Sequence, residues 1–62
     1  MNVREVLRIL KMNGWIIVAQ KGGHRQLKHP IKPERVPVAG HVKDDLAPGT
    51  LNSILRQAGL KE

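Results

Sequence analysis

Apolar residues near the start of the chain recur with the period of an α-helix. One face of such a helix carries the positions i, i+3, i+4 and i+7, which are Val3, Val6, Leu7 and Leu10. Asn2 is placed to cap the helix start, Glu5 stands where a capping box needs an acidic side chain, and Gly14 follows the end. The pattern therefore predicts a helix over residues 3–12.

A second helical pattern closes the chain. Its apolar face would consist of Leu51, Ile54, Leu55 and Ala58. Pro48 suits the first position of a helix, and Gly59 followed by Leu60 is typical of a Schellman ending. We therefore expect a helix over residues 48–58.

Three short segments between these helices have the composition of β-strands. Residues 15–20, WIIVAQ, are rich in β-branched residues and predict a strand that is buried on at least one face. Gly22 and Gly23 then predict a tight hairpin turn in which both residues have positive φ angles. Residues 24–29, HRQLKH, would form the returning strand, and residues 35–39, RVPVA, a third one.

The alternation of side chains along these strands assigns their faces. Leu27 is the only aliphatic residue in the second strand, so its side should face the core, which leaves His24, Gln26 and Lys28 on the open side. In the third strand Val36 and Val38 should point inward. Pro37 cannot donate to a sheet ladder, so that strand should lie at an edge or turn this position outward.

The order of the elements defines the fold class. A helix, three strands and a second helix predict a small two-layer α+β domain with the order α-β-β-β-α. A three-stranded antiparallel sheet would be covered on one face by both helices, and most of the other face would stay free.

The charge of the chain favours a polyanionic partner. Eleven Lys and Arg residues against five Asp and Glu residues give a formal net charge of +6, and a domain this basic commonly binds nucleic acid. Trp15 is the only aromatic residue, so the stacking platforms of RRM and OB-fold domains are excluded. Arg4, Arg8 and Lys11 form a stripe on the first helix that is either a solvated face or an edge that follows phosphates.

Other classes of site have little support. The chain has no cysteine and no apolar run near the length of a membrane span. Its polar start is unlike a secretion signal, so we expect a cytoplasmic protein. The three histidines, His24, His29 and His41, match no common ligand spacing. We expect no metal and no small-molecule cofactor.

A single histidine can nevertheless support acid–base chemistry on RNA. The 2′-hydroxyl of RNA is a built-in nucleophile, so a protein needs only to move a proton and neutralise the phosphate. His24 follows a flexible turn and has Lys21, Arg25 and Lys28 nearby in the sequence. An inert surface histidine remains the alternative.

The segments NGWIIVAQKGGHRQLKHP, RVPVAGH and APGTLNSILRQAGL resemble the HicA family of toxin mRNA interferases. The likeness covers nearly the whole chain, so we expect one HicA-like domain over residues 1–62. It implies a fold similar to the double-stranded RNA-binding domain. It also implies a metal-independent endoribonuclease that cleaves mRNA and arrests translation, and a HicB-like antitoxin that silences it.

The resemblance also implies roles for particular residues. The family's catalytic histidine corresponds to His24, with Lys21, Gly22, Gly23, Arg25 and Lys28 as the expected RNA contacts. Many members carry Ser or Thr where this chain has Gly23, and a second histidine where it has Arg25. His41 matches a histidine that is common after the third strand, and His29 is expected to be structural or to contact phosphate. Two alternatives stay open: a non-catalytic RNA-binding module, and an interaction protein whose activity has decayed.

Overall fold

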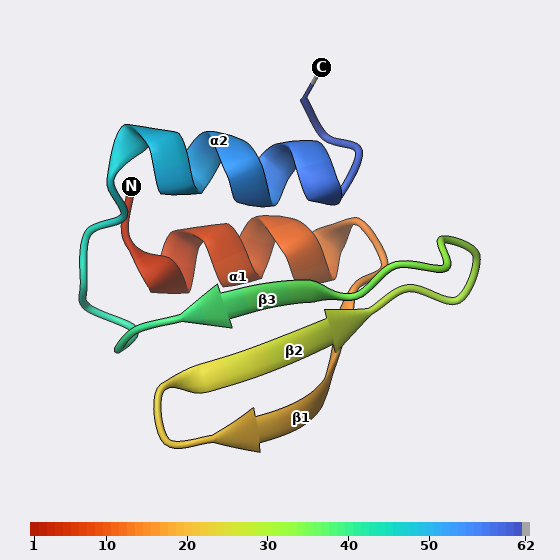
Figure 1. Cartoon of the computed structure of the whole chain (residues 1–62), viewed down its shortest axis with the longest axis horizontal. Helices are drawn as coiled ribbons and strands as arrows, with labels where there is room; N and C mark the ends of the chain where they lie inside the picture. Colours follow the sequence, from red (N-terminus) through yellow and green to blue (C-terminus); the bar gives the residue numbers. More distant parts are fainter. Residues whose placement is uncertain (62) are drawn as a thin grey trace.

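Two helices and three strands follow one another in the predicted order in the computed structural model, which describes residues 1–61 (Figure 1). The strands form one antiparallel sheet in the order β1-β2-β3, with both helices on one face. The elements are α1 (Val3–Met12), β1 (Ile16–Lys21), β2 (His24–Lys28), β3 (Val36–Ala39) and α2 (Pro48–Gln57). The predicted α+β architecture is confirmed.

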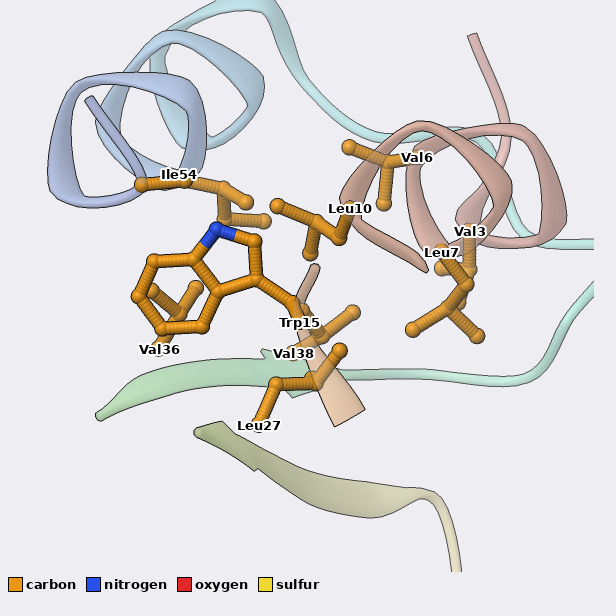
Figure 2. Close-up of a cluster of buried hydrophobic side chains, with 10 residues drawn as sticks. Val3, Val6, Leu7, Leu10, Trp15, Leu27, Val36, Val38 and Ile54 are labelled. Carbon is orange, nitrogen blue, oxygen red and sulfur yellow. The ribbon is translucent and has the colours of Figure 1, made fainter. Parts of the chain in front are cut away.

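The core lies between the helices and the sheet (Figure 2). The Trp15 ring lies between Ile54 of α2 and Val36 of β3, and it is only 1% exposed. The other buried side chains come from α1, β2, β3 and the end of α2: Val3, Val6, Leu7, Leu10, Leu27, Val38 and Ala58. The apolar faces predicted for α1, β2 and β3 are therefore the faces that are buried.

Local hydrogen bonds fix the helix ends as the sequence predicts. The Asn2 side chain accepts a hydrogen bond from the Glu5 amide at 2.9 Å, and the Glu5 carboxylate accepts one from the Asn2 amide at 3.3 Å. At the end of α2 the Leu60 amide donates to the Leu55 carbonyl at 2.8 Å, which is the long bond of a Schellman motif. No helix within residues 1–61 has the length and apolarity needed to cross a membrane.

The burial expected for residues 15–20 is confirmed only at the start of the segment, where Trp15 is buried and Ile17 packs against the core. Ile16 is 60% exposed and Val18 is 43% exposed, and only Ile17 is partly buried within this strand. The reason is the position of the helices, which pack against β3, whereas β1 lies at the opposite edge of the sheet. The pairing of β1 with β2 also shifts register between Ile17 and Ala19. The apolar composition of residues 15–20 therefore corresponds to a buried face only at Trp15 and Ile17.

The hairpin turn also differs from the prediction. Gly22 has a φ of +57°, whereas Gly23 is not among the residues with positive φ. A positive φ at only the first central residue is the pattern of a type II′ turn rather than type I′. The backbone at Gly23 therefore does not require glycine.

His29 has a structural position at the far end of the sheet from this turn. Its Nδ1 accepts hydrogen bonds from the amides of Ile31 at 3.1 Å and Lys32 at 3.3 Å. Since Nδ1 is the acceptor, Nε2 carries the proton and donates to the Asn13 carbonyl at 3.0 Å. The ring also packs near Trp15, with a centroid separation of 5.2 Å. His29 thus joins the end of α1 to the segment that follows β2.

Candidate active site

His24 occupies the first position of β2, directly after the hairpin turn. Its neighbours across the sheet are Lys21 in β1 and Ala39 in β3. The side chain is exposed, and within residues 1–61 its imidazole has no hydrogen-bond partner. Both ring nitrogens are therefore available to a ligand that approaches the open face of the sheet.

Polar and charged side chains of β2 lie on the open face at different distances from His24. Gln26 and Lys28 are exposed on the same side as His24, as the alternation predicts. Lys28 is four residues further along β2, which is about 13 Å in an extended strand. Lys21, Gly22, Gly23 and His24 meet at the hairpin end, whereas Lys28 lies at the other end of the strand.

Arg35 is a cation on this face that the sequence reasoning did not single out. Its guanidinium donates to the Gln26 side-chain oxygen at 3.1 Å. Pro37 pairs with Gln26 and is exposed. Arg35 is two residues before Pro37, so both lie on the same side of an extended segment. Alternation alone could therefore have placed Arg35 on the open side. Together with Lys21 and Lys28, it gives the open face three positive charges.

Arg25 lies on the opposite side of β2 from His24 and is only 7% exposed. Its Nη1 donates to the Gly40 carbonyl at 2.8 Å and more weakly to the Gly23 carbonyl at 3.4 Å. The Gly40 amide donates in turn to the Gly23 carbonyl at 2.8 Å. Arg25 therefore ties the hairpin turn to the residue after β3. The phosphate contact expected for Arg25 stays a prediction.

The three glycines at this end differ in what they tolerate. A side chain at Gly22 would meet nothing within 4 Å, so the turn is open to solvent. A Cβ at Gly23 would lie 3.4 Å from the Gly40 backbone, which is close but ordinary contact. Gly40 has a φ of +111°, a conformation that L-residues rarely adopt. Glycine is therefore required at Gly40 and optional at Gly23.

The remaining histidines lie on other segments than His24. His41 is exposed in the loop after β3, where its amide donates to the Asp44 carboxylate at 3.0 Å. His29 is engaged at the other end of the sheet. Across residues 1–61 no group of three His, Cys, Asp or Glu side chains is placed to hold a metal ion. The chemistry that this geometry offers is proton transfer by one exposed imidazole beside an ammonium group.

The buried position of Arg25 predicts the effect of its removal. We expect Arg25→Ala to lower the free energy of unfolding by about 2 kcal/mol, because two carbonyls lose a charged donor. Hydrogen exchange at the Gly40 amide should also become faster. Urea unfolding and amide exchange measure both effects, and Lys21→Ala, which removes an exposed charge nearby, is the control. Unchanged stability and exchange in Arg25→Ala would contradict the role of the guanidinium in holding the turn.

Comparison with known proteins assigns the chain to a family. No curated protein matches the chain. A family model described as the HicA toxin of bacterial toxin–antitoxin matches residues 3–60, which include both helices and all three strands. The resemblance noted in the sequence is thus confirmed at the level of the family. The chain belongs to the HicA toxin family of toxin–antitoxin systems, which implies an antitoxin partner.

Proposed function

We propose that this protein is an endoribonuclease that cleaves mRNA, with His24 as its general acid–base residue. The observation that carries the proposal is the exposed imidazole of His24, which has no partner within residues 1–61 and lies across the sheet from Lys21. Membership of a toxin family supports an activity that harms the cell. The formal net charge of +6 supports a nucleic-acid substrate.

The chemistry follows from what RNA and His24 each supply. Neutral His24 accepts the proton of a 2′-hydroxyl as the 2′-oxygen attacks the adjacent phosphorus. The bond from phosphorus to the 5′-oxygen then breaks, leaving a cyclic phosphate on one product. The leaving 5′-oxygen takes a proton from the imidazolium or from water. Lys21 lies next to His24 across the strands and offsets the negative charge that develops on the phosphate.

The surrounding backbone gives the substrate room. The open side of Gly22 allows an RNA backbone to approach the turn closely, and Gly23 brings no side chain next to His24. Arg25 holds this turn through its bond to Gly40. Lys28 and Arg35 extend the positive charge along the open face of the sheet. The part of the mRNA beyond the cleaved phosphate would bind there.

The antitoxin is proposed to be a HicB-like protein that covers this same face. Exposed apolar groups such as Ile16 lie beside the cations there, so a surface with both acidic and apolar residues would complement it. We expect His24 to lose its solvent exposure in the complex. A structure of the complex, or protection of His24 from chemical modification, checks this, and an exposed His24 would contradict it.

Replacing His24 tests the catalytic assignment. We expect His24→Ala to lower the cleavage rate at least about 100-fold, because a general acid–base group contributes on that scale. Induced cells should then keep growing with intact mRNA, whereas the unaltered protein and the control His41→Ala should arrest growth. RNA with a 2′-deoxy sugar at the cleaved position should resist the unaltered protein.

Two outcomes would contradict the proposal. Arrest by both the unaltered protein and His24→Ala, at matched protein levels and with intact mRNA, would indicate a binding module that acts without cleavage. Arrest by neither would indicate a toxin fold that has lost its chemistry.

Gly23→Ser tests the departure from the family's usual residue. The φ of Gly23 is not positive and a Cβ there makes ordinary contact, so we expect stability to change by less than about 1 kcal/mol. The resemblance places a hydroxyl at this position, and we therefore expect faster cleavage. Gly40→Ser is the control, because its backbone should make the same change destabilising. An unchanged or slower rate in a stable Gly23→Ser protein would mean that the hydroxyl has no use here.

A further inference from the structure

An open groove runs along the exposed side of α1, apart from the open face of the sheet. Its volume is about 510 Å³. Its lining combines the stripe of cations noted in the sequence with aliphatic side chains. The lining residues are Arg4, Leu7, Arg8, Lys11, Met12 and Val42.

The cations of this groove outnumber the acidic residues of α1 by three to one. Arg4, Arg8 and Lys11 are all exposed, and none of their side chains makes a hydrogen bond or an ion pair within residues 1–61. Glu5, the acidic residue of the same helix, is engaged with Asn2 in the capping box. Like charges three and four residues apart repel one another on a helix. The stripe therefore holds unbalanced charge that an anionic ligand would relieve.

The loop after β3 connects this groove to the candidate active site. The Arg4 amide donates to the Val42 carbonyl at 3.0 Å, so Val42 packs at the start of α1. Two residues earlier, the Gly40 amide donates to the carbonyl of Gly23, next to His24. The start of α1, the loop after β3 and the hairpin turn all lie at one end of the molecule (Figure 1). Backbone hydrogen bonds thus link the start of α1 to the hairpin turn through the loop after β3.

We propose that the α1 groove binds the phosphodiester backbone of the RNA strand whose scissile phosphate lies at His24. This inference rests on the proposed ribonuclease function and extends its substrate site to a second element. Arg4 and Lys11 are seven residues apart, about 10 Å along a helix, so the stripe contacts successive phosphates of one strand. The RNA crosses the loop after β3 between the two sites.

The need for phosphate contacts favours RNA in this groove. At the hairpin end, Lys21 is the cation paired directly with His24, whereas Lys28 lies at the other end of β2. Binding to nucleic acid at physiological salt depends on the number of phosphates that are neutralised. The only aromatic residue, Trp15, is buried, so base stacking cannot replace those contacts. The three cations of α1 supply them without selecting a base sequence.

The test compares two double variants with equal net charge in a His24→Ala background, which binds RNA without cleaving it. Arg8→Gln with Lys11→Gln removes two groove cations. Arg56→Gln with Lys61→Gln removes two exposed cations at the end of the chain and is the control. The probe is a fluorescein-labelled single-stranded RNA of about 12 nucleotides, within the range that small domains occupy.

We expect the groove variant to reduce the salt slope of log affinity by about 1.4, since each phosphate contact on a single strand contributes about 0.7. The control should keep the slope of the parent. An RNA of about 4 nucleotides, too short to reach both sites, should bind all three proteins alike. With His24 restored, the groove variant should show a higher KM and an unchanged kcat.

Equal slopes for the groove variant and the parent, in a protein that does cleave RNA, would overturn the groove while leaving the proposed function intact. Absence of RNA binding and cleavage altogether would overturn both. A groove variant that binds RNA normally but releases the antitoxin more easily would assign the groove to the protein partner and would also overturn the inference. Circular dichroism checks that the exposed substitutions leave α1 folded.

Discussion

The contact between Gly23 and Gly40 joins the segments on which the candidate site depends. One hydrogen bond links the hairpin turn to the residue after β3, and the Arg25 guanidinium bridges the two carbonyls from the core side. The loop that begins at Gly40 then pairs its carbonyls with the first amides of α1. The position of His24 therefore depends on a junction of backbone groups rather than on packing of its own side chain.

Under the proposed ribonuclease function, this arrangement explains how so small a chain can hold reactive chemistry. An enzyme that must supply nucleophile, base and acid needs several side chains held around a pocket. RNA brings its own nucleophile, so one exposed imidazole with nearby cations is enough. An exposed site buries little surface of the substrate. Its affinity for RNA must therefore come from many phosphate contacts. The open sheet face also leaves the imidazole within reach of an inhibitor that covers it.

The parts of this structure that sequence could predict are those set by near neighbours. The bounds of α1, its capping box, the Schellman ending of α2 and the faces of β2 depend on residues a few positions apart. The exposure of most of β1 was missed, because its composition does not reveal that the helices pack over β3 instead. The bonds of Arg25 were missed for a similar reason, since Gly40 is 15 residues away and its carbonyl gives no signal in the sequence. His24 could be placed on the open face because alternation from Leu27 is local, whereas the hydrogen bonds that link the start of α1 to the hairpin turn join segments far apart in the sequence.

The core position of Trp15 has a practical consequence for studying the protein. It is the only aromatic residue in the chain, its indole is almost wholly buried, and the His29 ring lies beside it. Near-ultraviolet absorption and emission therefore come from a single chromophore at the centre of the packed layers. A red shift of that emission reports loss of packing between the helices and the sheet. Ligands on the open sheet face or along α1 approach surfaces that the indole does not reach. The emission of Trp15 therefore reports unfolding and should not respond to such binding.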